Sequence, residues 1–159
     1  MHNAAAGYWG IATGSREAST SLCGYDASFA AGLLEAAAQV CADRAPVGLI
    51  AYDHCYPYPL NAVRPLIADF AVALILTPQP TGRAFATLDV RHVNDDGPAT
   101  SMTLPALEAV RAGVPAGRSL PLHSPSRMML AAARGSTVNI EIEGDDEAQD
   151  MEQEDDSNG

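Results

Sequence analysis

The feature that most constrains the fold is a long alanine-rich segment, Ala27–Ala42, whose apolar residues surround most of a helix. A helix that is apolar nearly all round must be covered on several sides, so we expect it to be largely buried. Asp26 directly precedes this segment and stands where an N-cap residue would lie. The pattern therefore predicts a central helix with Asp26 as its cap.

Strands are predicted on both sides of this helix. Ala18–Tyr25 favours a short strand before it, and the apolar run Val47–Tyr52 is typical of a buried parallel strand after it. A strand–helix–strand unit favours a right-handed crossover between parallel strands. Further along the chain, Asp69–Thr77 and Ala84–Val93 predict two strands joined by a Pro/Gly turn. These patterns indicate an α/β domain.

The remaining patterns predict shorter elements. A helix rich in small residues is expected before Gly14, a helix closed by Gly113 is expected later in the chain, and a helix and a strand follow. Their ranges are Asn3–Thr13, Leu104–Ala112, Ser126–Arg134 and Thr137–Ile142.

The net charge of −11 is concentrated at one end of the chain. Ten acidic residues and no basic one lie between Glu141 and Asp156, so the rest carries ten acidic residues against nine lysines and arginines. We therefore expect one domain over 1–142 and an acidic disordered tail over 143–159. No basic patch suggests nucleic-acid binding. The apolar runs are too short to span a bilayer and no signal-peptide pattern opens the chain, so a cytoplasmic location is expected.

Two residues compete for the apex of the predicted strand-to-helix corner, Cys23 and Asp26. Such a corner can expose a nucleophile, and the helix start favours the thiolate form of a cysteine placed there. The cysteines number three and form no CxxC pair, so a disulfide framework or a zinc site is not expected. Adjacent side chains seldom form a working nucleophile–base pair, which argues against His54 and Cys55 as one. We expect no metal and no cofactor.

Three phrases carry a resemblance to a known family: HNAAAGYW (2–9), LCGYDASFAAGLLEAAAQV (22–40) and AYDHCYPYPLNAVRP (51–65). They resemble the β-ketoacyl synthase family, and more closely the short chain-length-factor-type ketosynthase-like proteins of aryl-polyene-type clusters. The resemblance covers roughly residues 2–142. It implies a thiolase/ketosynthase-like layered α/β fold, of which this chain would be an N-terminal-half fragment, because the resembled proteins continue upstream of Met1.

The resemblance also implies a role for the corner. With no gap between Gly7 and Val47, the family's active-site cysteine falls on Asp26, whereas Cys23 at the apex would require three extra residues after the corner. A carboxylate is a poor acyl acceptor, because a mixed anhydride is labile. The four histidines, His2, His54, His92 and His123, lie outside the family's His-Gly-Thr-type and Gly-rich contexts.

The resemblance thus implies a non-catalytic subunit that forms a heterodimer with an active ketosynthase and depends on acyl carrier protein indirectly. The strand expected to pair across the two-fold axis consists of Ala18, Ser19, Thr20, Ser21 and Leu22. Two alternatives stay open: an acyltransferase that uses Cys23 as its acyl acceptor, and a truncated fragment without independent function.

Overall fold

A computed structural model describes residues 4–84, 86–93, 99–123, 128–132 and 136–143. The helices predicted over Asn3–Thr13, Ala27–Ala42 and Leu104–Ala112 are confirmed as α1, α2 and α4. Four of the predicted strands are confirmed as β1, β2, β3 and β5. The elements are α1 (Ala4–Thr13), the 3₁₀ helix η1 (Tyr25–Ala27), α2 (Ser28–Asp43), β1 (Val47–Asp53), α3 (Leu60–Val63), β2 (Phe70–Leu76), β3 (Thr87–Val93), α4 (Pro105–Gly113), the 3₁₀ helix η2 (Ala116–His123), β4 (Met128–Ala132) and β5 (Ser136–Glu143).

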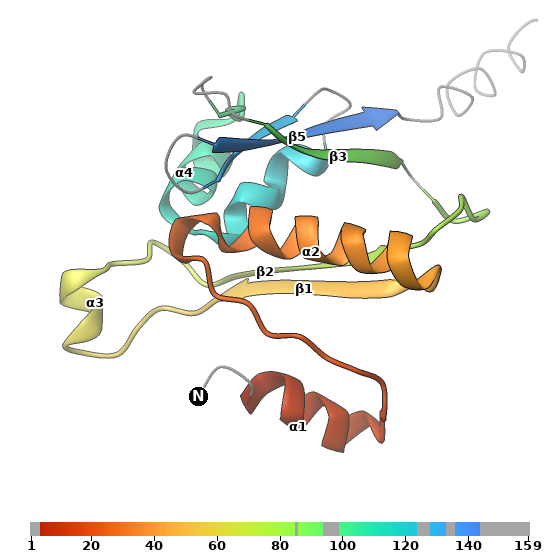
Figure 1. Cartoon of the computed structure of the whole chain (residues 1–159). Coiled ribbons are helices and arrows are strands. Elements are labelled where there is room, and N and C mark those ends of the chain that lie inside the picture. Colours follow the sequence, from red (N-terminus) through yellow and green to blue (C-terminus); the bar gives the residue numbers. More distant parts are fainter. Residues whose placement is uncertain (1–3, 85, 94–98, 124–127, 133–135, 144–159) are drawn as a thin grey trace, which may run out of the picture.

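The central helix α2 lies between two sheets (Figure 1). One sheet is the pair β1–β2, and the other has the order β3–β5–β4. The buried face of α2 includes Phe29 and Leu33, whose exposed fractions are 1% and 0%. Partly buried residues of both sheets pack around this core, such as Leu49 of β1 and Val90 of β3. The predicted central helix is confirmed, but its burial is partial, because alanines such as Ala31 and Ala38 are exposed.

The β1–β2 sheet differs from the sequence-based prediction. The two strands run antiparallel, with Val47 opposite Leu76 and Asp53 opposite Phe70, so Val47–Tyr52 is not the parallel strand that its apolar run predicted. The predicted parallel crossover is also wrong, because its first strand, over Ala18–Tyr25, does not form. Both strands alternate between half-buried and exposed residues along their whole length. Because side chains of a strand alternate between faces, one face of this sheet packs on α2 and the other does not. We call the second face the outer face; its residues are Gly48, Ile50, Tyr52, Ala71, Ala73 and Ile75.

The second sheet consists of β3, β4 and β5. β3 and β4 both pair antiparallel with β5, so β2 and β3 belong to different sheets and not to one hairpin. The segment predicted as a helix over Ser126–Arg134 contains strand β4 instead. Its apolar run is short, and a run of this length has no periodicity that separates a strand from a buried helix. Residues 144–159 of the predicted tail lie outside the described residues, and the domain boundary at 142/143 stays a prediction.

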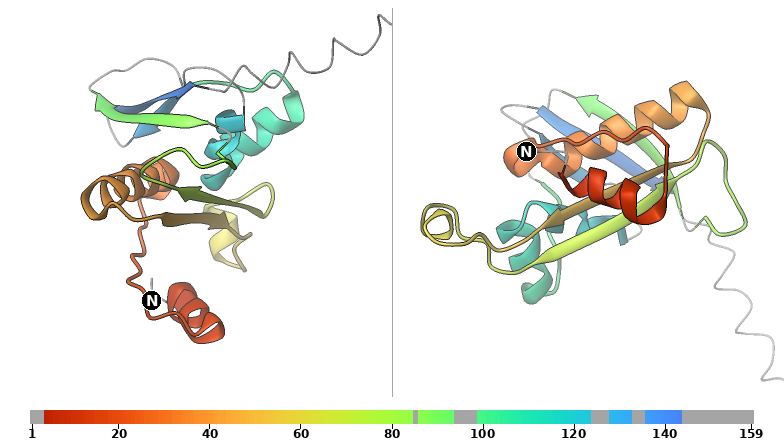
Figure 2. Two further views of the ribbon diagram at one scale, coloured as in Figure 1. Left: turned by 90° about the vertical axis from the view of Figure 1, so that its right-hand side faces the viewer. Right: turned by 90° about the horizontal axis from the view of Figure 1, so that it is seen from below.

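The chain before η1 is sparsely packed. Helix α1 contains no buried residue and lies on the outer side of the β1–β2 sheet (Figures 1 and 2). Residues 15–24 form neither helix nor strand, so the strand predicted over Ala18–Tyr25 is absent. A strand needs a hydrogen-bonded neighbour, and the described part of the chain offers none to this segment.

The segment around η2 also contributes buried residues. Val114, Ala116, Ser119 and Leu122 are all less than a tenth exposed, and Leu122 belongs to the same core as Phe29 and Leu33. The Ser119 hydroxyl donates to the carbonyl oxygen of Ala116 at 2.8 Å, which satisfies the buried hydroxyl. No described helix is both long enough and apolar enough to cross a membrane.

Candidate functional site

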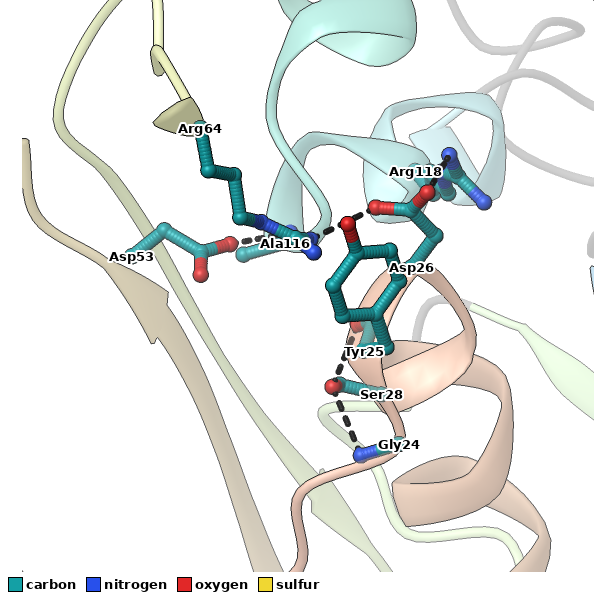
Figure 3. A network of polar contacts seen from close by, with 8 residues as sticks. All are labelled: Gly24, Tyr25, Asp26, Ser28, Asp53, Arg64, Ala116 and Arg118. Atoms are coloured by element: carbon teal, nitrogen blue, oxygen red, sulfur yellow. Dashed lines mark hydrogen bonds and ion pairs between the residues drawn. The ribbon is translucent and has the colours of Figure 1, made fainter. Parts of the chain in front are cut away.

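The corner that starts α2 is a strained turn. Tyr25 has a φ of 57°, in the left-handed region that non-glycine residues seldom adopt. Ser28 stabilises this turn, because its hydroxyl accepts from the N–H of Gly24 at 3.0 Å and donates to the carbonyl oxygen of Tyr25 at 2.7 Å (Figure 3). The N–H of Ala27 also donates to the carbonyl oxygen of Gly24 at 3.0 Å. Asp26 therefore lies inside a hydrogen-bonded turn directly before the helix.

The Asp26 carboxylate is bound by arginines from two distant segments. Arg64, just after α3, donates from Nη2 to Asp26 Oδ1 at 2.7 Å. Nη2 of Arg118, from η2, lies 3.9 Å from Asp26 Oδ2. The Arg64 guanidinium also lies over the Tyr25 ring, 3.4 Å from its centroid, which is a cation–π contact (Figure 3). The strained turn thus presents its carboxylate to two cationic groups.

The predicted capping role of Asp26 is wrong. Helix α2 begins at Ser28 with Ala27 as its N-cap residue, and no side chain caps it there. The carboxylate of Asp26 instead binds Arg64, because a charged hydrogen bond to a guanidinium is stronger than one to a neutral N–H. Asp26 lies within η1, so its carboxylate remains at the helix start, where negative charge is favoured.

Asp53 positions the second arginine. It ends β1, and its Oδ2 accepts a hydrogen bond from the N–H of Ala116 at 2.6 Å. Ala116 is the first residue of η2, so this bond ties the sheet to the 3₁₀ helix that carries Arg118. Arg64 is mostly buried, with its side chain 19% exposed, and no described acceptor contacts its Nη1 atom. The site is therefore built by η1, the start of α2, the end of β1, the segment after α3, and η2.

Cys23 lies outside this turn. It is exposed and precedes Gly24, in the segment without helix or strand. The same segment contains the predicted pairing residues Ala18–Leu22, of which Thr20 accepts a weak hydrogen bond from Gln39 of α2 at 3.5 Å. The structure therefore places Asp26, and not Cys23, in the turn that precedes α2, while the catalytic equivalence of either residue stays a prediction.

A second polar cluster follows β1. His54 Nδ1 lies 2.7 Å from Asp69 Oδ2, and the N–H of Cys55 donates to Asp69 Oδ1 at 2.7 Å. That N–H is the main reason why the pKa of Asp69 is lowered. His54 thus pairs with Asp69 and not with its neighbour Cys55.

The Cys55 thiol is held in its neutral form. The hydrogen bond with Asp69 is the main cause that raises the pKa of this thiol, and the thiol also donates to the carbonyl oxygen of Leu66 at 3.6 Å. Because the thiolate is the reactive form of cysteine, Cys55 is poorly suited to act as a nucleophile.

The sequence reasoning missed most of the residues that surround Asp26. Arg64 and Arg118 lie 38 and 92 positions away along the chain. Asp53 and Arg64 both lie in the phrase AYDHCYPYPLNAVRP, which carried the family resemblance but gave neither residue a role. That phrase, with Arg64 directly before a proline, was the signal that could have pointed to Arg64. His92 is exposed, whereas His2 and the side chain of His123 lie outside what the structure describes. Among the described residues, no group of three His, Cys, Asp or Glu side chains is placed to hold a metal ion.

The geometry of this corner suits charge pairing better than covalent catalysis. A carboxylate at a helix start can form charged hydrogen bonds with neighbouring guanidinium groups, as Asp26 does with Arg64. A thiol in this place would gain thiolate character, but the residue present is a carboxylate. The corner therefore places a carboxylate, and not a thiol, between the helix start and Arg64.

Comparisons with known proteins gave one match. The family model described as Beta-ketoacyl synthase, N-terminal domain, matches residues 1–116. This range includes α1, the corner with Asp26, both strands of the first sheet and Arg64. No curated protein and no solved structure matched the chain.

Proposed function

Because the chain belongs to the β-ketoacyl synthase N-terminal domain family, we propose that it is a non-catalytic subunit of a ketosynthase. In this proposal it acts like a chain length factor and supports an active β-ketoacyl synthase during fatty-acid or polyketide-type elongation, such as that of aryl polyenes. The thiolase-like layering is part of the proposal, with this chain as its N-terminal half, and so is a cytoplasmic location.

One observation carries the proposal: a carboxylate occupies the turn at the start of the central helix. A condensing enzyme accepts an acyl group when a thiolate attacks a thioester carbonyl, forms a new thioester and releases the carrier thiol. Asp26 cannot form that thioester, and its oxygen is held by Arg64 at 2.7 Å. The partner ketosynthase would then supply the thiolate and receive acyl groups from an acyl carrier protein.

The other cysteines do not restore the missing chemistry. Cys55 is held as a thiol by Asp69, and Cys23 lies in the exposed segment before the turn. An acyltransferase that uses Cys23 would also lack the contacts with Ser28 and Arg64 that organise the turn around Asp26. These contacts favour the subunit over the enzyme.

Co-purification tests this proposal. The tagged chain would be co-expressed with an untagged, cysteine-bearing β-ketoacyl synthase from the same source cell. Light scattering would then measure the molar mass of the purified complex. We expect one copy of each chain. The substitution Leu22→Asp, in the proposed pairing segment, should abolish the complex, whereas Leu104→Asp, which changes an exposed leucine before α4, should not. A folded wild-type chain that does not associate would overturn the proposal.

A further inference from the structure

We propose that helix α1 is a strap that closes on the outer face of its own β1–β2 sheet, so that each surface covers the other. The strap is open in the structure, because α1 contains no buried residue although it lies on the outer side of this sheet (Figures 1 and 2). The inference needs one copy of this chain and stands apart from the proposed function. It rests on two exposed apolar surfaces and on the hinge that joins α1 to the rest of the chain.

The first surface is the outer face. All six of its residues are apolar, aromatic or glycine, and Ile50, Tyr52 and Ile75 are exposed by 53%, 58% and 80%. A sheet face that meets water normally carries polar residues at alternate positions. Strand β3 shows that pattern, because Asp89 and Arg91 alternate with apolar residues. The outer face lacks it, which indicates a surface that is covered in solution.

The second surface is α1. Its sequence, AAAGYWGIAT, has no charged residue, and Tyr8, Trp9 and Ile11 are all more than 60% exposed. Tyr8 and Ile11 are three positions apart and therefore share one face of the helix. The hydroxyl of Thr13 already donates to the carbonyl oxygen of Trp9 at 2.8 Å, so burial of the helix would leave this hydroxyl paired. Helix α1 thus has the composition of a helix with a buried face.

Gly14 is the hinge of the strap. It directly follows α1 and has a φ of 66°, which glycine adopts without strain. No atom beyond its chain neighbours lies within 4 Å of the place where a Cβ would be. Residues 15–24 after it form neither helix nor strand. Because hinges are often small residues that absorb a change in φ and ψ, rotation at Gly14 can bring α1 onto the sheet while the rest of the chain stays in place.

The tether selects the chain's own α1 over the helix of a second copy. A short flexible linker keeps the two groups that it joins at an effective concentration in the millimolar range. A second copy at micromolar concentration therefore competes at a disadvantage of roughly a thousandfold. The structure also places α1 on the side of the sheet that it would cover (Figure 2). The closed strap would shield the outer face, so any protein that binds this face must first displace α1.

Fluorescence of Trp9 tests closure, because Trp9 is the only tryptophan of the chain. We expect its emission maximum at a shorter wavelength than in the urea-unfolded chain, in samples that light scattering shows to have the 16.6 kDa mass of one chain. Ile75→Lys places a charge on the outer face and should return the maximum to the unfolded value, whereas Leu104→Lys changes an exposed leucine elsewhere and should not. Unfolded-like emission from the monomer, a shift seen only in a dimer, or a shift that Ile75→Lys leaves unchanged would overturn the proposal.

Disulfide trapping identifies the surface that α1 covers, and circular dichroism would verify that every variant is folded. In a background with the three natural cysteines replaced by serine, one chain would carry both Ile11→Cys and Ile75→Cys. Oxidation should form an internal disulfide in this chain, whereas Ile11→Cys combined with Leu104→Cys, the matched control, should form none. Two copies that each carry one of the first two substitutions should stay unlinked when mixed. Copies that link to each other without an internal disulfide, or no link in any sample, would contradict the strap.

Discussion

The Asp26 carboxylate lies beside two arginines, Arg64 and Arg118, that are far from it in the sequence. Arg64 binds its carboxylate and lies over Tyr25, whose left-handed backbone costs about 1 kcal/mol or more. Because Arg64 is mostly buried, its contribution combines an ion pair with the packing of its aliphatic stem and guanidinium plane. We expect this residue to stabilise the turn more than a surface ion pair would.

Replacing Arg64 tests that expectation. Arg64→Ala should lower the free energy of unfolding by about 1–3 kcal/mol, since it removes a buried side chain and leaves Asp26 without its closest partner. Arg91→Ala is the control, because Arg91 pairs with Asp89 on an exposed surface and should cost less than about 0.5 kcal/mol. Urea denaturation measures both; equal losses would contradict the structural role of Arg64.

Glu108 predicts a pH dependence. The Arg111 guanidinium, which donates to Glu108 at 2.7 Å, and then the N–H of Met102 lower the pKa of this carboxyl from 4.5 to about 2. A lowered pKa in the folded state stabilises the fold above about pH 4.5, and the stabilisation is lost as pH falls toward 2. Glu108→Gln should therefore be less stable than wild type at pH 7, and the difference should shrink below pH 4.5.

Thermal unfolding at several pH values between 7 and 2 measures this difference. Glu17→Gln, a substitution in the exposed segment before α2, is the matched control and should follow the wild-type curve. A difference between Glu108→Gln and wild type that stays constant with pH would contradict the lowered pKa.

At the scale of elements, the sequence predicted which helices and strands are present better than it predicted which strands pair. The central helix was predictable because its apolar residues surround it, and α2 is covered by a sheet on each side. The antiparallel pairing of β1 with β2 was not predictable, because a run of apolar residues is compatible with parallel and antiparallel neighbours alike. The strand expected over Ala18–Leu22 fails for another reason: a strand is a property of two segments, and its predicted partner is another chain.

The position of α2 between two sheets predicts a sharp contrast between adjacent residues. Leu33 is fully buried, whereas the next residue, Leu34, is only partly buried. Leu33→Ala should lower the free energy of unfolding by about 2–5 kcal/mol, because it leaves a cavity in the core. Leu34→Ala should cost about 1 kcal/mol or less, since it removes less buried area. Chemical denaturation of both variants decides; similar losses would contradict the sheet–helix–sheet packing.

At the scale of the whole molecule, the sequence predicted the protein family and the position of Asp26 before the central helix. It did not predict the residues that surround Asp26. The phrases that indicated a ketosynthase lie within the matched residues 1–116, and they placed Asp26 before the central helix. The arginines were out of reach, because α3, β1 and η2 must first fold to bring Arg64 and Arg118 together. Whole-molecule packing also creates the open surfaces, since the outer face and α1 are both left uncovered within one chain.

The most direct test of the central claim is the intact mass of the chain after incubation with an acyl thioester of an acyl carrier protein. A carboxylate at the corner predicts no acyl adduct on the wild-type chain. Asp26→Cys should gain one acyl group, because the helix start and Arg64 would favour its thiolate, which attacks the thioester and releases the carrier thiol. An adduct on the wild-type chain that Cys23→Ser abolishes would contradict the claim and make Cys23 the acyl acceptor.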